Sequence, residues 1–259
     1  AQAVASGSYD IVVCGGVELT MSGPVTGKPA YMRRRLTPIE IGTWNGEIPD
    51  RCYTKWFSTN MAMDNICSQY RLNYGLSAED IDETLIHIYM NGRYNSMGNE
   101  LAFNHGDPMD TVRMLGMSSI EEWLHSDIYN PKVSEYVRKA FTEFHAEGAA
   151  AAVVVSEEVA RDLKNKPIEI LAGTASTAEI STPNIETFLT RRCVNEIYDI
   201  TGLSGKDIDL LMANDFRIPM TMVAAEETGY IPRGECWRYF IDGRTRYDGD
   251  KPINTNGGR

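Results

Sequence analysis

The sequence has few basic side chains for its length. It carries 25 Lys and Arg residues against 36 Asp and Glu residues, and its formal net charge at pH 7 is −11. General nucleic-acid binders and proteins that bind anionic membranes need basic surface patches. We therefore expect no nucleic acid and no membrane as a partner, although a local basic pocket for a phosphate is compatible with this charge. The only basic run, Arg33–Arg35, is typical of a solvated loop, and the alternative is a contact to an anionic ligand.

Cysteine and histidine are also scarce. The five Cys residues form no CxxC pair, and the four His residues have no metal-ligand spacing. A scattered, odd set of Cys is typical of reduced thiols, so we expect a cytoplasmic protein without a disulfide framework or a metal site. His145 is the best placed of the histidines, because it precedes an Ala-rich strand pattern, but none of the four has a visible carboxylate partner.

The composition is otherwise that of an ordinary globular protein. The 259 residues are 42% hydrophobic and 24% charged, which suffices for the core of one or two domains. No apolar run is long enough to span a bilayer.

One stretch, residues 208–229, combines a strand pattern with a helix pattern. The apolar run 208–213 predicts a strand buried on both faces, and Asn214 and Asp215 follow it. Pro219 suits the first turn of a helix, and Gly229 suits the stop at its end. Open α/β sheets bind ligands at the carboxyl ends of their strands, which is where Asn214 and Asp215 would lie. The alternative is that these two residues only cap the helix.

Similar patterns recur along the chain and predict a mostly parallel sheet covered by helices. The Ser77–Asp80 capping box begins a helix that we expect to end near Tyr89, and the stretch after it is polar and turn-rich. The other expected elements are strands at 9–13, 148–155 and 167–171, helices at 61–74, 118–124 and 183–201, and a helix that begins after Ser156.

Six segments with distinctive motifs follow one another along nearly all of the chain. They are CGGVELTMS (14–22), SSIEEWLHSDIYNP (118–131), EGAAAAVVVSEEVA (147–160), TGLSGKDIDLLMANDF (201–216), EETGYIPRGECWRYFIDGRT (226–245) and GDKPINTNGGR (249–259). Together and in this order, they resemble thiolases, and in particular thiolases of the sterol-carrier-protein-x type.

The resemblance implies a thiolase-like α/β fold in five α-β-α-β-α layers, with mixed, mostly parallel sheets. It assigns residues 1–140 to the N-terminal half, with an inserted loop domain at about 24–130, and residues 141–259 to the C-terminal half. It also implies an acyltransferase that cleaves or forms a carbon–carbon bond beside a CoA thioester. In the family, the nucleophilic Cys lies upstream of the segment that matches residues 1–16, and the Gly-His-Pro base lies downstream of the Gly-Gly that closes this sequence. We therefore expect a partial chain.

The resemblance also implies a set of partners. Acyl-CoA is the expected substrate, so coenzyme A enters as part of the substrate and no separate cofactor is expected. A homodimer or larger assembly is expected, and some relatives of this type associate with a small protein built of a zinc ribbon and an OB-fold.

The family motifs carry over to particular residues of this sequence. Asn214 and Asp215 correspond to the turn on the oxyanion side, where an Asn amide can donate a hydrogen bond but cannot shuttle protons. The family's His is Asn here, and Phe216 falls one place early. The residues implied in substrate binding are Phe216, Glu147, Gly148, Gly257 and Gly258.

Two other functions fit the same fold. A retro-aldolase acting on an acyl-CoA side chain needs no Cys nucleophile, and the many Tyr residues are compatible with acid–base chemistry there. A non-catalytic subunit that supports an active partner is the third reading.

Overall fold

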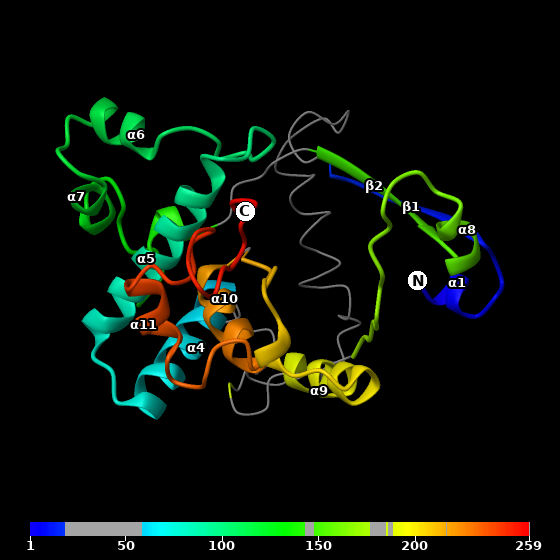
Figure 1. Cartoon of the computed structure of the whole chain (residues 1–259). Helices are drawn as coiled ribbons and strands as arrows, with labels where there is room; N and C mark the ends of the chain where they lie inside the picture. The colour runs from blue at the N-terminus through cyan, green and yellow to red at the C-terminus, as the bar shows by residue number, and fades with distance from the viewer. Residues whose placement is uncertain (19–58, 143–147, 177–184, 186–188, 216, 259) are drawn as a thin grey trace, which may run out of the picture. The chain divides into compact units, whose positions relative to one another are not determined.

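The computed structural model describes residues 1–18, 59–142, 148–176, 185, 189–215 and 217–258, without the side chains of 59–62 and 189–190 (Figure 1). The chain divides into two compact units. The first, called the sheet unit here, comprises Ala1–Ile48 and His145–Ala175. The second, called the helical unit, comprises Pro49–Phe144 and Ser176–Arg259.

The sheet unit is built on two long strands. Its elements are α1 (Gln2–Ala5), β1 (Ile11–Glu18), β2 (Gly148–Val155) and α8 (Glu157–Arg161). β1 and β2 are antiparallel, and their register runs from Ile11 opposite Val155 to Glu18 opposite Gly148. The sequence predicted mostly parallel sheets; among the described residues the only sheet is this antiparallel pair, and the predicted strand at 167–171 is not a strand.

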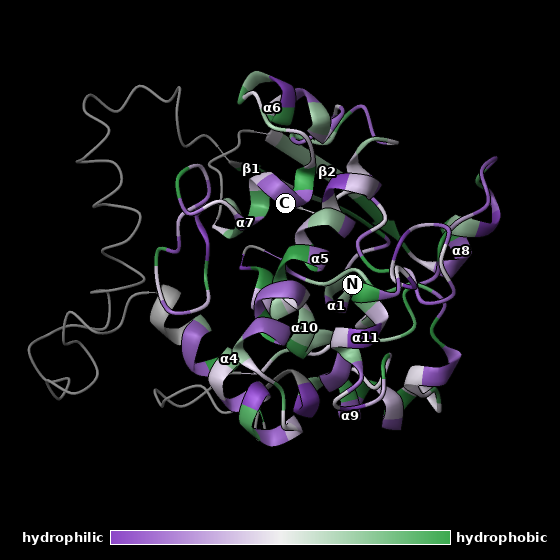
Figure 2. Cartoon of the chain, turned by 90° about the vertical axis from the view of Figure 1, so that its left-hand side faces the viewer, coloured by the Kyte–Doolittle hydropathy of each residue, from purple (hydrophilic) through white to green (hydrophobic). Residues whose placement is uncertain are grey.

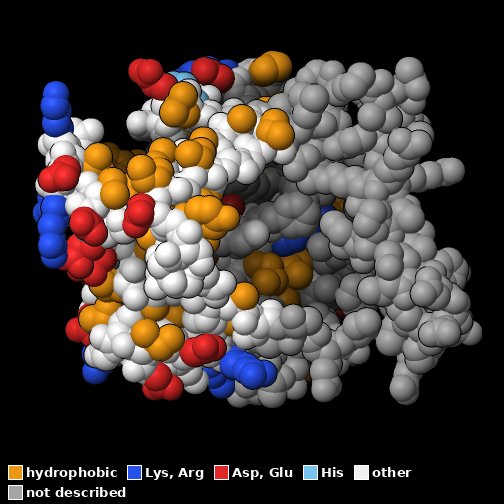
Figure 3. Space-filling view, turned by 90° about the vertical axis from the view of Figure 1, so that its right-hand side faces the viewer, with side chains coloured by type: hydrophobic (Ala, Val, Ile, Leu, Met, Phe, Trp, Pro, Cys, Tyr) orange, Lys and Arg blue, Asp and Glu red, His pale blue; other side chains and the backbone are white. Residues whose placement is uncertain are grey.

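Apolar side chains of this sheet lie at the surface. Val13 is 70% exposed and Val153 is 64% exposed, and hydrophobic side chains are visible on the face drawn in Figure 3. Residues 148–155 form a strand as predicted, because their small and β-branched side chains suit a pleated backbone. Within the described residues, that strand is not buried.

The helical unit contains the remaining elements. They are α4 (Thr59–Tyr74), α5 (Ala78–Ser96), α6 (Pro108–Met114), α7 (Ile120–His125), η2 (Lys139–Phe141), α9 (Leu189–Thr201), η3 (Gly205–Asp207), α10 (Ile218–Glu227) and α11 (Cys236–Ile241). α10 packs against α4, α5, α9 and α11, and α5 also packs against α11. Every buried hydrophobic side chain among the described residues belongs to this unit; Figure 2 shows the hydropathy along its helices.

α5 begins at the predicted capping box. The Ser77 hydroxyl accepts from the Asp80 amide, and the Asp80 carboxylate accepts from the Ser77 amide at 2.8 Å. Ile81, Leu85 and Ile88 then form a buried stripe one helical turn apart. The helix does not end near Tyr89 as predicted but continues to Ser96, through residues that looked like a loop.

α10 confirms the predicted helix after residue 217. Pro219 lies in its first turn, and Gly229 follows its C-cap with φ of +66°. Most of its side chains are buried, so it is the central helix of the unit. The predicted strand before it is wrong in extent: residues 208–213 form a single parallel bridge, between Leu211 and Ile253.

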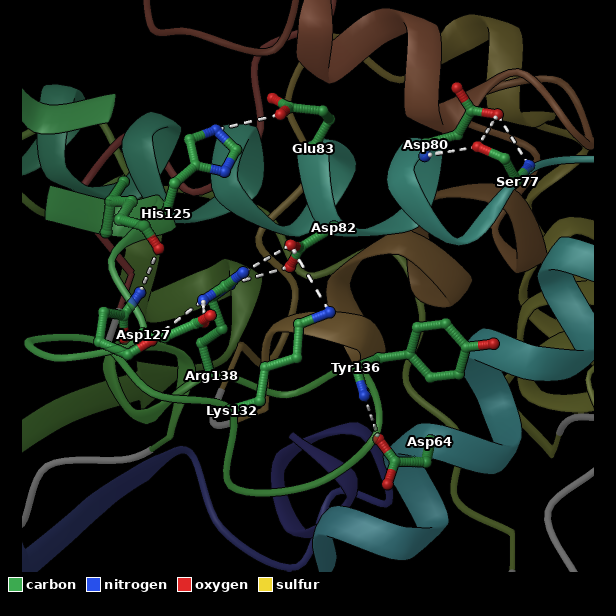
Figure 4. A network of polar contacts seen from close by, with 12 residues as sticks. Asp64, Ser77, Asp80, Asp82, Glu83, His125, Asp127, Lys132, Tyr136 and Arg138 are labelled. Atoms are coloured by element: carbon green, nitrogen blue, oxygen red, sulfur yellow. Dashed lines mark hydrogen bonds and ion pairs between the residues drawn. The ribbon is translucent and has the colours of Figure 1, made fainter. Parts of the chain in front are cut away.

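A network of charges ties the segment around Arg138 to α5 (Figure 4). The Arg138 side chain is 6% exposed and donates to both carboxylate oxygens of Asp82, at 3.1 and 2.8 Å. It also donates to Asp127 at 3.0 Å, and Lys132 pairs with Asp82 at 3.6 Å. These hydrogen bonds to Asp82 and Asp127 raise the pKa of Arg138, which therefore remains charged. The network is structural, because its members pair with one another.

Helices together with a two-stranded sheet confirm the α/β class. The division into two thiolase halves with an inserted loop domain stays a prediction. No helix in the described part of the chain is both long and apolar enough for a membrane span.

Candidate active-site turns

Two turns that the sequence singled out lie together in the helical unit. One contains Asn214 and Asp215, and the other contains Gly257 and Gly258. A β-carbon placed on Gly258 would overlap an Asp215 carboxylate oxygen, so that carboxylate lies directly against the Gly258 backbone. Gly258 also has φ of +67°, which disfavours any other residue there. The contact therefore requires glycine for both space and backbone conformation.

Backbone and amide hydrogen bonds hold the two turns in register. The Leu211 amide donates to Pro252 O at 3.2 Å, and the Asn254 amide donates to Leu211 O at 3.0 Å. The Ala213 amide donates to the Asn254 side-chain oxygen at 2.8 Å. The segment before Asn214 is thereby joined to the segment before Gly257.

The end of α5 supports the Gly257 turn from its other side. A β-carbon on Gly257 would lie 2.5 Å from the Ser96 β-carbon, and one on Gly92 would lie 3.3 Å from Gly257 O. Asn95 donates to Asn254 O at 3.1 Å, and Asn99 donates to Asn256 O at 2.8 Å. The turn is thus packed closely against a helix.

These α5 contacts were missed from sequence because their polar residues predicted a loop. The signal was nevertheless present in the spacing of Asn91 and Asn95, which are four residues apart and so lie on one face of the helix. Asn91 and Asn95 both donate to Ile253 O, at 3.2 and 3.0 Å. These two Asn side chains therefore join α5 to the backbone of a neighbouring segment.

A small cavity of about 20 Å³ lies between α5 and the two turns. Its lining includes the polar residues Arg93, Asn104 and Asp215, together with Gly257. The Arg93 Nε is buried and has no hydrogen-bond partner among the described residues. A cavity of this volume has room for about one water molecule. Arg93 is the charged residue of the site that sequence reasoning did not find.

Asn214 itself is exposed, whereas Asp215 is partly buried. The N-cap of α10 is Arg217, so neither Asn214 nor Asp215 occupies the capping position that was their alternative role. An Asn side-chain amide is a group that can donate a hydrogen bond to an oxyanion.

The other predicted substrate-binding residues do not join this site in the described structure. Gly148 begins β2 in the sheet unit, where it is exposed and pairs with Glu18. Glu147 and Phe216 lie outside the described residues, as does His145. The structure thus brings together Asp215, Gly257 and Gly258, with Asn214 beside them.

The sequence showed no carboxylate partner for any histidine, but His125 lies 3.0 Å from a Glu83 carboxylate oxygen. Near the two turns, the His105 ring contacts Ser96 O at 3.3 Å.

Burial raises the pKa of the Cys67 and Cys236 thiols, so both remain protonated. Burial also lowers the pKa of His87, which stays neutral at pH 7. In the described ranges no cluster of His, Cys, Asp and Glu has the arrangement of a metal site.

Comparison with known proteins confirms the predicted thiolase resemblance. Residues 172–259 match the thiolase C-terminal domain-like family. An acetyl-CoA acetyltransferase of Methanothermobacter thermautotrophicus is 25% identical over 99% of this chain and 60% of its own length. A 17-hydroxy-3-oxo-4-pregnene-20-carboxyl-CoA lyase of Mycobacterium tuberculosis is 26% identical over 100% of this chain and 64% of its own length.

A solved structure shows the same fold. It is titled Ltp2-ChsH2(DUF35) aldolase, has a TM-score of 0.68 at 22% identity, and matches 99% of this chain and 61% of its own. The chain therefore spans about three-fifths of the length of the relatives that it matches.

Proposed function

On the premise that the chain is thiolase-like along its length, we propose that its protein is a thiolase-type acyl-CoA C-acyltransferase. It cleaves or forms the carbon–carbon bond next to a CoA thioester. The observation that carries this proposal is the close approach of Asp215 to Gly258, because it unites two turns that the thiolase resemblance assigns to one site. The activity named for the archaeal relative also supports it.

The chemistry assigns a separate task to each part of the site. Breaking or forming this bond places negative charge on the thioester oxygen as an enolate develops. The Asn214 amide donates a hydrogen bond to that oxygen, and a preorganised donor of this kind stabilises charge that appears in the transition state. Arg93 provides a fixed positive charge beside the small cavity. Asp215 positions the glycine turn through its contact with Gly258.

A retro-aldolase is the second candidate. The lyase name of the mycobacterial relative favours it. This reaction requires no thiol nucleophile.

Dependence on free CoA separates the two reactions. Thiolysis of a 3-oxoacyl-CoA consumes one CoA thiol and yields acetyl-CoA plus a shortened acyl-CoA. Retro-aldol cleavage of a 3-hydroxyacyl-CoA consumes no thiol and yields a ketone or aldehyde plus an acyl-CoA. We expect the intact protein that carries this chain to cleave the 3-oxo substrate only when CoA is added. Cleavage of the 3-hydroxy substrate without CoA would support the aldolase, and cleavage of neither would contradict both.

Asn214 variants test the oxyanion role. Asn214→Ala should lower kcat by roughly 10²–10³ with little effect on folding, the effect of removing one oxyanion donor. Asn214→Asp should lose at least as much, because a carboxylate repels the oxyanion. Asn165, exposed in the sheet unit, is the matched control, and its Ala and Asp variants should keep full turnover. Unimpaired kcat in Asn214→Asp would remove Asn214 from the site.

We further propose the finer features that the resemblance implies. They are the five-layered fold, a homodimer or larger assembly, a cytoplasmic location, a role in lipid metabolism, and association with a small partner protein. The match to a structure whose title names two components, Ltp2 and ChsH2(DUF35), supports the fold and motivates the search for a partner. Light scattering of the purified protein, alone and with a candidate partner, tests the assembly; a monomeric mass at micromolar concentration would contradict the dimer.

A further inference from the structure

A second and much larger cavity, of about 510 Å³, lies elsewhere in the helical unit. It is bounded by α9, the C-terminal end of α10, the segment that leads to α11, and Lys251. It shares no lining residue with the small cavity at the Asp215 turn. Its volume falls within the range of small-molecule sites, about 300–1,000 Å³.

Four basic side chains from separate parts of the sequence line this cavity: Arg191, Lys206, Arg233 and Lys251. The carboxylates in the lining are those of Glu226 and Glu227. The cavity therefore carries surplus positive charge, even with both carboxylates ionised, in a chain whose net charge is −11. The sequence showed no basic run here, because these residues become neighbours only in the folded unit.

Glu227 holds the two arginines in place. Its side chain is 4% exposed, and its two oxygens accept from Arg191 at 2.6 and 2.8 Å and from Arg233 at 2.5 Å. One buried carboxylate thus fixes two guanidinium groups along one wall. The Glu227 carboxylate neutralises only part of the combined charge of Arg191 and Arg233.

The two lysines differ from the arginines in their charge partners. Within the described residues, neither Lys206 nor Lys251 forms an ion pair with a carboxylate. The neighbouring Asp207 accepts from the Ser204 amide and hydroxyl, at 2.9 and 2.6 Å, and Asp250 pairs with Arg244. The Lys251 ammonium lies 4.4 Å from the centre of the Tyr230 ring. Both ammonium groups therefore retain hydrogen-bond donors for a ligand.

The Glu226 carboxylate accepts hydrogen bonds on the inner side of the cavity wall. One of its oxygens accepts from the Tyr70 hydroxyl at 2.5 Å and from the Cys236 amide at 3.0 Å. Burial raises the pKa of this carboxyl, which favours its neutral form. Glu226 therefore opposes an anionic ligand less than a solvent-exposed carboxylate would.

We propose that this cavity is a binding site for a phosphate-bearing small molecule, with Lys206 and Lys251 contacting the phosphate oxygens. The aromatic side chains of Tyr198 and Tyr239 in the lining provide apolar surface for the rest of the ligand. A free nucleotide and the phosphorylated adenosine end of CoA carry the same recognised group. The proposal stands apart from the reaction at the Asp215 turn, because the two cavities have no residue in common.

Calorimetric titration of the intact protein with pyrophosphate, ADP and CoA at low ionic strength tests the site. We expect saturable binding of at least one probe. Lys206→Glu and Lys251→Glu should each weaken that binding at least tenfold, because each replaces an attractive charge by a repulsive one. Lys139→Glu is the control: it makes the same charge change at an exposed residue outside the cavity and should change the affinity less than twofold.

The pattern of probes distinguishes the source of the phosphate. If ADP and CoA both lose affinity in the two cavity variants, the site recognises the shared diphosphate; if CoA alone does, it recognises features specific to CoA. Both results support the site, whether or not the protein cleaves acyl-CoA. Absence of saturable binding by all three probes would overturn it. So would equal weakening by all three lysine variants, because it would indicate a general charge effect. Melting curves confirm that each variant is folded.

Discussion

Similar apolar side chains are exposed in one unit of this protein and buried in the other. In the sheet unit, β1 and β2 pair along their whole length, yet Val13 and Val153 remain largely exposed. In the helical unit, Leu85 and Ile81 on α5 are fully buried against neighbouring helices. Strand pairing satisfies backbone hydrogen bonds without covering the faces of the sheet. Burial of side chains requires a second layer, and only the helical unit shows one among the described residues.

The comparison predicts that equivalent substitutions have unequal effects in the two units. Each pair below places one change in the helical unit and a matched change in the sheet unit. Free energies of unfolding from denaturant titration, combined with hydrogen exchange that reports each unit separately, are the measurement throughout.

The largest difference should come from two arginine ion pairs. Arg138→Ala should cost roughly 3–5 kcal/mol, because it leaves the mostly buried Asp82 carboxylate without its main partner. Arg161→Ala breaks an ion pair with Glu157 in which the two side chains are 73% and 82% exposed, and it should cost about 0.5 kcal/mol or less. Equal costs would show that burial does not separate these pairs.

A pair of apolar truncations tests the cores directly. Leu85→Ala should cost about 2–5 kcal/mol, because it opens a cavity in a packed helix interface. Val13→Ala, at a side chain that is 70% exposed, should stay within about 0.5 kcal/mol of the wild type. A cost for Val13→Ala close to that of Leu85→Ala would mean that β1 is covered in solution.

Two glycines with positive φ separate conformational strain from crowding. Gly7→Ala, with φ of +73° and open space around it, should cost about 1–2 kcal/mol from strain alone. Gly258→Ala has similar strain and must also displace Asp215, which adds about 1–3 kcal/mol.

Removing the crowding group gives the control for this pair. In the double variant Asp215→Ala with Gly258→Ala, the part of the stability loss that comes from crowding should be recovered. Adding Asp215→Ala to Gly7→Ala should recover no stability. Strict additivity in both double variants would argue against the Asp215–Gly258 contact.

The smallest difference should come from helix caps. Ser77→Ala removes a capping box from the long α5 and should cost about 1 kcal/mol. Ser156→Ala removes the cap of the five-residue α8, where the hydroxyl lies 3.4 Å from the Val159 amide, and should cost less. A short helix propagates little stability from its first turn.

The α5 cap also has a pH signature. Hydrogen bonds from the Ser77 amide and hydroxyl lower the pKa of Asp80 below its usual value. A carboxyl with a lowered pKa stabilises the folded state above its unfolded pKa, near pH 4, and loses that contribution as the pH falls through the folded value. The stability difference between wild type and Asp80→Asn should therefore shrink below about pH 4. A difference that is constant down to pH 2 would contradict the role of the charge.

Local chemistry made several helix boundaries predictable. Ser77 and Asp80 begin α5, Ser156 begins α8, and Pro219 and Gly229 bracket α10, each as the sequence indicated. Each signal acts within a few residues, through an orphan amide that a side chain satisfies or a φ value that only one residue type adopts at low energy. Such interactions need no distant partner.

The sequence by itself also indicated some of the residues that meet at the candidate site. It indicated Asn214, Asp215, Gly257 and Gly258 through motif resemblance, and the structure places Asp215 against Gly258. It did not indicate Arg93, because a lone Arg in a polar stretch has no distinguishing pattern until α5 brings it beside the cavity.

Only the tertiary structure decided burial, strand direction and the charge of the large cavity. The pattern at 148–155 predicts a strand but not its antiparallel partner, and the run at 208–213 predicts a buried strand where one bridge forms. Lys206 and Lys251 are 45 residues apart in number, yet they line one cavity. These properties depend on contacts between residues distant in sequence, and side-chain periodicity and capping signals carry no information about which distant residue will be the neighbour.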